Sequence, residues 1–475
     1  MMRKILKLYI TSLCLMFVAA IPVLQASAAA PFPDPSQLHY PPLQFNLPEA
    51  KRIVLKNGIV LYFLEDKELP LVAVNALIKT GTMYDPAGKA GVAELTAYLM
   101  KTGGTKKLAS SEIDDRFDLL AASPYITASL DSVQVDFSFL NKDLDQGLDL
   151  LAQILMTPAF EQAKFDLAKG LKSEELRRLK DDPQSLAIRE FNRLIYRDNP
   201  RGRFVSSKSL KNIERKDLIE FHQEYFQPQN IMFAVTGDIS RKEAINIMQK
   251  YFGNRETGGK PAALPAPPRS SAGGFFYIDK DIPQSTIISG QFAPAKSDQG
   301  YYAFALLDFI IGSGGFPSRI FSAIRSNEGL AYSAGTFYRA RPDHGVFAAY
   351  AFTKTESTYK TLSLMNSVIN NIMDKTLTKD EIQWAKNSIN NGFIFSFTSP
   401  QQIAWQQMKL EYDGLPAEFL SSYRSKINSV QIEDLNRIAA KYLKKNNNTL
   451  ILGNTKKFGK PLPDVSQPVL ITPEE

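Results

Sequence analysis

The sequence predicts an α+β fold: two homologous α/β sandwich domains, each a mixed sheet covered by helices on one face, joined by an extended linker. Three observations predict this fold. The chain has 475 residues, which is too long for one compact core and suggests two domains of roughly 200 residues each. Its two halves repeat one another. A segment that cannot bury a core divides them.

The repeat is visible without gaps. Residues 168–187, AKGLKSEELRRLKDDPQSLA, align with residues 385–404, AKNSINNGFIFSFTSPQQIA. The alignment places Pro183 on Pro400, an offset of 217 residues. Two copies of one fold are the simplest account of this pattern.

The dividing segment, GNRETGGKPAALPAPPRSSAGG, is rich in Gly, Pro, Ala and Ser and has no apolar period. Such a composition is typical of an extended linker. The predicted organisation is a signal peptide at 1–28, an N-terminal domain at 45–252, the linker at 253–274, a C-terminal domain at 275–458 and a tail at 459–475.

Each half mixes strands and helices in the same order. Asn57 followed by Gly58 interrupts a β-rich run and is a strong hairpin signal. Strands at both ends of a half, with helices between them, favour a sheet covered by helices. The elements expected are strands at 52–66, 71–82 and 230–239 and helices at 142–155 and 161–180 in the first half, and strands at 284–292 and 449–454 in the second.

The N-terminus is typical of a secretory signal. The first seven residues carry three basic side chains, residues 8–24 are apolar, and residues 25–28 (QASA) supply the small residues that a signal peptidase needs. A retained membrane anchor is the alternative, which Thr11, Ser12 and Pro22 in the apolar run disfavour. We therefore expect cleavage near Ala28 and a periplasmic protein, with secretion as the alternative.

Composition excludes several classes of function. The only cysteine, Cys14, lies in the predicted signal, so the mature chain has no disulfide or thiol chemistry. The net charge of +7 falls to +4 once the three basic residues of the signal are removed, which is too mild to indicate a nucleic-acid partner. No later segment is apolar enough to span a bilayer, so we expect no stable membrane span.

Four motifs in order resemble one peptidase family: KTGTMYDPAGKAGVAEL, KSEELRRLKDDP, FHQEYFQPQNIMFAVTGDI and GSGGFPSRIFSAIRSNEGLAYS. This is the insulinase-like family of inverted zincins, which includes pitrilysin and the mitochondrial processing peptidases. The resemblance covers residues 45–455 and is greatest to short bacterial members with two homologous domains.

Active members carry H-x-x-E-H, in which two imidazoles bind Zn²⁺ and the glutamate takes the proton of the attacking water. Aligned with that motif, Glu94 stands at the first histidine, Ala97 at the catalytic glutamate and Tyr98 at the second histidine. The third ligand of the family corresponds to Glu175, which as a single carboxylate cannot hold zinc. We expect no metal in this chain and interpret Glu175 as a helix-surface carboxylate.

The histidines offer no replacement site. The chain has three, His39, His222 and His344, and none lies within a helical turn of another. His222 is expected to be a packed or surface residue rather than a ligand. A self-sufficient zinc peptidase is therefore not expected.

The second half keeps a different set of residues. Gly312, Gly314 and Gly315 predict a flexible turn before a helix, and Gly329 is a candidate helix C-cap.

Arg325 and Tyr332 stand seven residues apart, at positions that match a pair with which family members assist the zinc domain. A guanidinium and a phenol are good donors for a substrate carbonyl or its oxyanion. The alternative is an arginine and a tyrosine held only by local packing.

The resemblance implies a non-catalytic subunit of a heterodimeric zinc peptidase, inactive by itself. It would supply Arg325, Tyr332 and chamber walls, while a homologous H-x-x-E-H partner holds the zinc and cleaves peptides or unfolded segments. Two alternatives stay open: a structural or assembly protein without catalysis, and a module that holds peptides at a sheet edge. The intact Arg/Tyr pair favours the subunit of a heterodimeric peptidase over both alternatives.

Overall fold

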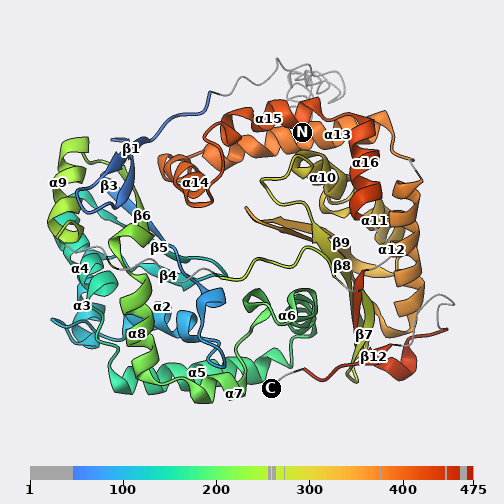
Figure 1. The fold of residues 1–475 in the computed structure, drawn as a ribbon, viewed down its shortest axis with the longest axis horizontal. Helices are drawn as coiled ribbons and strands as arrows, with labels where there is room; N and C mark the ends of the chain where they lie inside the picture. The colour runs from blue at the N-terminus through green and yellow to red at the C-terminus, as the bar shows by residue number, and fades with distance from the viewer. Residues whose placement is uncertain are drawn as a thin grey trace, which may run out of the picture. The chain divides into compact units, whose positions relative to one another are not determined.

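The first half of the chain is organised around a six-stranded mixed sheet with the strand order β1-β2-β6-β3-β5-β4 (Figure 1). Strands β2 and β6 are parallel, and the other neighbours are antiparallel. The strands are β1 Lys51–Val54, β2 Val60–Glu65, β3 Leu71–Ile78, β4 Tyr125–Ala128, β5 Val133–Leu140 and β6 Ile231–Gly237. The predicted hairpin at Asn57 and Gly58 joins β1 to β2, with Gly58 at φ 88°.

The second half repeats this sheet with the order β12-β7-β11-β8-β10-β9. The parallel pair β7 and β11 corresponds to β2 and β6, and β9 takes the edge place of β4. The strands are β7 Gly274–Asp279, β8 Gln284–Ala293, β9 Ala331–Ala340, β10 Gly345–Lys354, β11 Asn448–Gly453 and β12 Val469–Leu470. The predicted α+β class with two mixed sheets is confirmed, and β12 comes from the segment predicted as a tail.

The structure, a computed structural model, describes residues 46–254, 258, 264–271, 273–374, 376–443, 447–460 and 468–473. The predicted signal peptide, Cys14, His39 and part of the linker lie outside these residues. None of the helices that the structure describes is long and apolar enough to cross a membrane.

Helices of each half cover one face of its own sheet. The predicted helices at 142–155 and 161–180 correspond to α4 and α5. In the first half the helices are α2 Val92–Thr102, α3 Ser110–Leu120, α4 Leu144–Met156, α5 Gln162–Leu179, α6 Pro183–Tyr196, α7 Ser207–Asn212, α8 Arg215–Tyr225 and α9 Arg241–Phe252. In the second half they are α10 Tyr301–Asp308, α11 Arg319–Phe321, α12 Thr358–Met373, α13 Lys379–Ile394, α14 Pro400–Tyr412, α15 Phe419–Ser429 and α16 Ile432–Tyr442.

The two halves exchange one helix, which the sequence did not predict. Helix α6 packs on the second sheet and α14 packs on the first (Figure 1). Neighbouring residues of a strand point to opposite faces. Accordingly, Ile287 of β8 lies in the core of the second half, whereas Ile288 packs with α6. The sequence predicted helices on one face of each sheet. The structure adds a helix from the other half on the opposite face.

The aligned prolines mark the starts of these exchanged helices. Pro183 and Pro400 are the first residues of α6 and α14, where the missing N–H costs nothing. Asp182 and Ser399 cap the two helices by accepting backbone N–H groups. The repeated segment thus contains the start of the helix that each half packs against the sheet of the other half.

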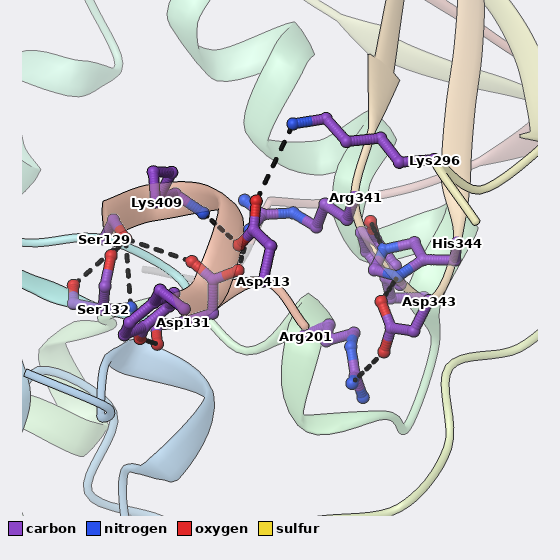
Figure 2. A network of polar contacts seen from close by, with 12 residues as sticks. Ser129, Asp131, Ser132, Arg201, Lys296, Arg341, Asp343, His344, Lys409 and Asp413 are labelled. Atoms are coloured by element: carbon purple, nitrogen blue, oxygen red, sulfur yellow. Dashed lines mark hydrogen bonds and ion pairs between the residues drawn. The ribbon is translucent and has the colours of Figure 1, made fainter. Parts of the chain in front are cut away.

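A polar joint connects the halves beside α14; it is made of Asp131, Arg341 and Asp413, which Figure 2 labels, together with Tyr412. Arg341 donates from Nη1 to a carboxylate oxygen of Asp131 at 2.6 Å, and the Tyr412 hydroxyl donates to the backbone oxygen of Asp131 at 2.6 Å. Asp413, the residue after α14, is paired with Lys409 of that helix and lies 3.8 Å from Lys296 Nζ. These contacts hold the β4–β5 loop to the C-terminal half.

Candidate functional site

The four positions aligned with the family's zinc site lie around one pocket of about 300 Å³. Glu94, Ala97 and Tyr98 come from α2, and Glu175 comes from α5. Residues of the edge strand β4 form another part of the lining. The structure therefore brings together all four residues that the sequence assigned to a degenerate zinc site.

A lysine occupies the place between the two carboxylates of this pocket. Lys172 Nζ lies 2.5 Å from Glu94 Oε2 and 2.9 Å from Glu175 Oε1. Burial by itself would lower the pKa of Lys172, but the charges and hydrogen bonds of Glu94 and Glu175 outweigh it and raise that pKa above its usual range. The ammonium is therefore charged and occupies the carboxylate oxygens that a metal would require as ligands.

The donor set does not fit zinc. The pocket offers two carboxylates, a phenol and an ammonium, and no imidazole or thiolate. Among the residues that the structure describes, no group of three or more His, Cys, Asp or Glu could hold a metal ion. Ala97, which is buried, carries no base where active members have the glutamate.

Sequence reasoning identified Glu175 but missed Lys172. The lysine is three residues before Glu175 on α5, a spacing that puts both side chains on the same helix face. That spacing was the available signal. The expected surface position of Glu175 is correct, because its side chain is 68% exposed.

The helix that carries the lost motif is still firmly anchored. Asp85 accepts the backbone N–H groups of Gly91 and Ala93, each at 2.7 Å, at the start of α2. Burial raises the pKa of Asp85 to about 7, against the lowering effect of these two N–H groups and of Arg203. The local framework of the zinc site remains while its ligands do not.

The two described histidines are packed into the structure and lie apart from this pocket's lining. His222 is buried, its Nε2 donates to the Leu155 carbonyl at 2.8 Å, and its ring stacks on Phe226. His344 is also buried, with Nδ1 2.6 Å from Asp343 and Nε2 2.7 Å from the Tyr196 hydroxyl (Figure 2). The expectation of a packed His222 is confirmed.

In the second half, the structure brings Arg325 and Tyr332 together. The Arg325 Cζ lies 4.8 Å from the ring centroid of Tyr332, 4.8 Å from that of Phe321 and 5.3 Å from that of Phe316. Tyr332 is 83% exposed at the start of the edge strand β9. The three rings surround the guanidinium at cation–π distances, and sequence reasoning missed both phenylalanines.

The guanidinium and hydroxyl groups of this pair have no polar partner among the described residues. No residue in the described part of the chain forms an ion pair or hydrogen bond with the Arg325 guanidinium or the Tyr332 hydroxyl. The C-cap of the helical segment Ser322–Asn327 is Glu328, and the predicted cap Gly329 lies one residue later at φ 61°, where its N–H donates to the Arg325 carbonyl. The chain thus positions two donors and leaves them open to a ligand.

The glycine-rich loop differs from the flexible turn that the sequence predicted. A Cβ on Gly312 would lie 2.4 Å from the backbone nitrogen of Thr336, and one on Gly314 would lie 2.5 Å from the ring of Trp384. These two glycines are therefore required by close packing. Only Gly315, at φ 77° with open space around it, serves the turn itself.

Comparisons with known proteins agree with this fold. The family description "Insulinase (Peptidase family M16)" matches residues 62–207, and "Peptidase M16 inactive domain" matches residues 212–389. An uncharacterized zinc protease of Rickettsia felis is 26% identical over 348 residues, which cover 72% of this chain and 82% of the relative. The uncharacterized zinc protease YmxG of Bacillus subtilis is 21% identical over 396 residues, covering 82% and 94%.

Solved structures show the same architecture. A peptidase M16 inactive domain from Pseudomonas fluorescens has a TM-score of 0.79 at 23% identity and covers 87% of this chain and 100% of its own. A protease from Helicobacter pylori has a TM-score of 0.77 at 21% identity, covering 86% and 100%. With two family matches over most of the chain, this protein belongs to the insulinase family of peptidases, as a member whose zinc ligands are replaced.

Proposed function

We propose that this chain is the non-catalytic subunit of an exported zinc peptidase heterodimer. A homologous partner with H-x-x-E-H would hold the zinc and the general base. This chain would contribute Arg325 and Tyr332 to the partner's site. The observation that carries the proposal is the pair itself: two hydrogen-bond donors that lie together and have no partner in the described part of their own chain.

The chemistry of the pair suits the transition state of peptide hydrolysis. Attack of water on a carbonyl places negative charge on its oxygen, and positioned donors stabilise that charge. The guanidinium of Arg325 presents several donors in one plane. The exposed Tyr332 hydroxyl adds a neutral donor beside it.

The first half could not complete such a site by itself. Lys172 bridges the only two carboxylates at the former ligand positions, and an apolar methyl group stands where the base is needed. A cation at that place would also repel a metal ion. Zinc, if the reaction uses it, therefore has to come with another chain, and the likeness of relatives described as zinc proteases favours a homologous one.

The test is reconstitution. This chain without residues 1–28 and an exported homologue from the same genome that carries H-x-x-E-H would be purified separately and mixed. We expect cleavage of an unstructured peptide by the mixture only, with a 1:1 complex by light scattering. Full activity of the homologue alone, or a stable complex that remains inactive, would refute the proposal.

A second function, holding extended peptides, is favoured by one observation in the first half. Strand β4 is an edge strand that adjoins the Lys172 pocket, and its outer side has no described strand partner. Tyr98 and Leu171 are exposed at the same pocket. A sheet edge with apolar side chains beside it can bind a peptide as an added strand. In that case unstructured peptides would bind this chain alone, and Tyr332→Phe would not alter their affinity.

A further inference from the structure

A third region, a pocket lined by basic side chains, shares no lining residue with the Lys172 pocket and does not include Arg325 or Tyr332. It has a volume of about 730 Å³ and is formed by α6, the loop that follows it, α7, and residues of β7 and β11. Five basic side chains line it: Arg189, Arg193, Arg197, Arg203 and Lys208. A lining with so many cations requires an explanation, because like charges brought together in a concavity repel one another.

Two carboxylates oppose these five cations. Asp198 is in the wall, and the fully buried Glu190 lies beneath it. Arg193 Nε lies 2.8 Å from Glu190, and Arg189 Nε lies 3.7 Å from it. Arg189 also lies over the ring of Phe204, with its Cζ 5.8 Å from the ring centroid. Arg189 and Arg193 are thus held in place by the protein itself.

The remaining three cations are not held in this way. Arg197, Arg203 and Lys208 form no ion pair with any residue in the described ranges, although Arg203 acts on the buried Asp85 at longer range. Five cations opposed by two carboxylates leave the pocket between α6 and α7 with an excess of three positive charges. Such an excess in a concavity attracts an anion.

Two further features point to a ligand. Arg197 has φ 50° and ψ −125°, a strained conformation for a residue with a side chain, and it stands at the pocket wall. Asn448, which is 2% exposed, also lines the pocket, and its amide nitrogen has no hydrogen-bond partner in the described structure. A buried donor without an acceptor is costly, and an anionic ligand or its bound water would satisfy it.

We propose that this pocket binds a compact ligand with two or more phosphate groups. Guanidinium groups match phosphate oxygens in pairs, and three free cations require more than one negative charge. The volume is that of a site for a small molecule. Phe204, Phe276 and Leu194 in the lining offer contacts for an apolar or ring-shaped part of the ligand. The site uses neither the Lys172 pocket nor Arg325, so it is independent of the proposed peptidase partner.

Calorimetric titration of the chain alone with pyrophosphate tests the proposal. We expect one site per chain, with weaker binding of inorganic phosphate and a loss of affinity as salt is raised. Arg203→Gln and Lys208→Gln should each weaken pyrophosphate binding about tenfold, as loss of one charge-assisted hydrogen bond implies. Arg241→Gln, which removes an exposed cation of α9 outside the pocket, should change the affinity less than about twofold.

Arg197→Gly provides a second variant that is not expected to harm folding, because glycine adopts φ 50° without strain. It should lower the affinity for pyrophosphate while leaving the melting temperature unchanged or higher. Three results would overturn the proposal: no pyrophosphate binding at low salt, an equal loss in Arg241→Gln, or citrate binding as tightly as pyrophosphate. The last would show a site for carboxylates instead of phosphates.

Discussion

The Lys172 pocket of the first half and the Arg325–Tyr332 pair of the second half treat charge in opposite ways. In the pocket, one ammonium bridges Glu94 and Glu175 and offsets part of their negative charge. In the pair, a guanidinium is held only by aromatic rings, and its donors have no partner in the described part of the chain. Carboxylates that the fold already pairs with a cation are less available to a ligand, whereas donors that the fold leaves unpaired are suited to one. The proposed function rests on this difference, since only the pair in the second half offers open donors to a ligand.

Removing one hydroxyl from each region gives the sharpest contrast. In a reconstituted heterodimer, Tyr332→Phe should lower kcat by roughly 10²–10³, by analogy with the loss of one oxyanion-hole donor. Tyr98→Phe is the matched control, since it deletes the hydroxyl of another exposed tyrosine, in the Lys172 pocket, and should leave kcat within about twofold. Peptide hydrolysis is measured with zinc content and complex formation checked on the same samples. Equal effects of the two substitutions would remove the distinction between the regions.

Rebuilding the zinc ligands tests whether Lys172 keeps a metal out of the first-half pocket. Glu94→His, Ala97→Glu and Tyr98→His together restore the family pattern beside Glu175, but they leave the Lys172 ammonium in the pocket. Adding Lys172→Ala should raise zinc affinity at least about tenfold over the triple variant, because a cation no longer opposes the metal. Competition with a chelator gives both affinities. If the triple and quadruple variants bind zinc alike, Lys172 does not block the site.

The pH dependence of stability compares a buried aspartate from each half. Burial raises the pKa of Asp85 to about 7 from 3.8, so the folded state binds more protons than the unfolded state between these values. The free energy of unfolding should therefore fall as pH rises through this window. Burial raises the pKa of Asp308 to about 6, which gives the same sign over a narrower window.

Urea unfolding at about pH 5 and about pH 8 measures this fall. Asp85→Asn and Asp308→Asn should each make it smaller, and Asp85→Asn should do so more. An unchanged or larger fall in Asp85→Asn would show that Asp85 is ionised throughout the range. The comparison uses the change with pH within each variant, so any general loss of stability on substitution cancels.

The polar joint between the halves should contribute least. The ion pair of Arg341 with Asp131 is partly exposed, so Arg341→Gln should lower the free energy of unfolding by no more than about 1 kcal/mol. Arg339→Gln, two residues earlier and without an ion pair among the described residues, is the control. A loss several times larger in urea unfolding would mean that this contact controls the association of the two halves.

The sequence predicted the fold through local signals. The Asn57–Gly58 turn, the repeated prolines and the apolar strands all report on short segments, and the structure contains the corresponding elements. The exchange of α6 and α14 was not predicted, because an amphipathic helix does not reveal which of two similar sheets it will cover. Its apolar face is satisfied by either one.

The candidate sites divide in the same way. Alignment with the family motif predicted Glu94, Ala97, Tyr98 and Glu175, and the structure places them at one pocket. Lys172 was missed because a lysine on a polar helix is ordinarily a solvated residue, and only the approach of α2 to α5 turns it into a bridge. The pocket lined by Arg197 and Arg203 could not be predicted either, because it forms only when the chain folds. Its arginines are close together in the sequence, but Asn448 comes from the other half.

The central claim is that the first half of this chain has lost zinc and that the ammonium of Lys172 stands in its place. The most direct measurement is elemental analysis of the purified chain after equilibration with excess zinc and removal of free metal. The account predicts no stoichiometric zinc and no chelator-sensitive cleavage of peptides by the chain alone. One tightly bound zinc per chain, lost together with peptide cleavage on Glu175→Gln, would contradict it.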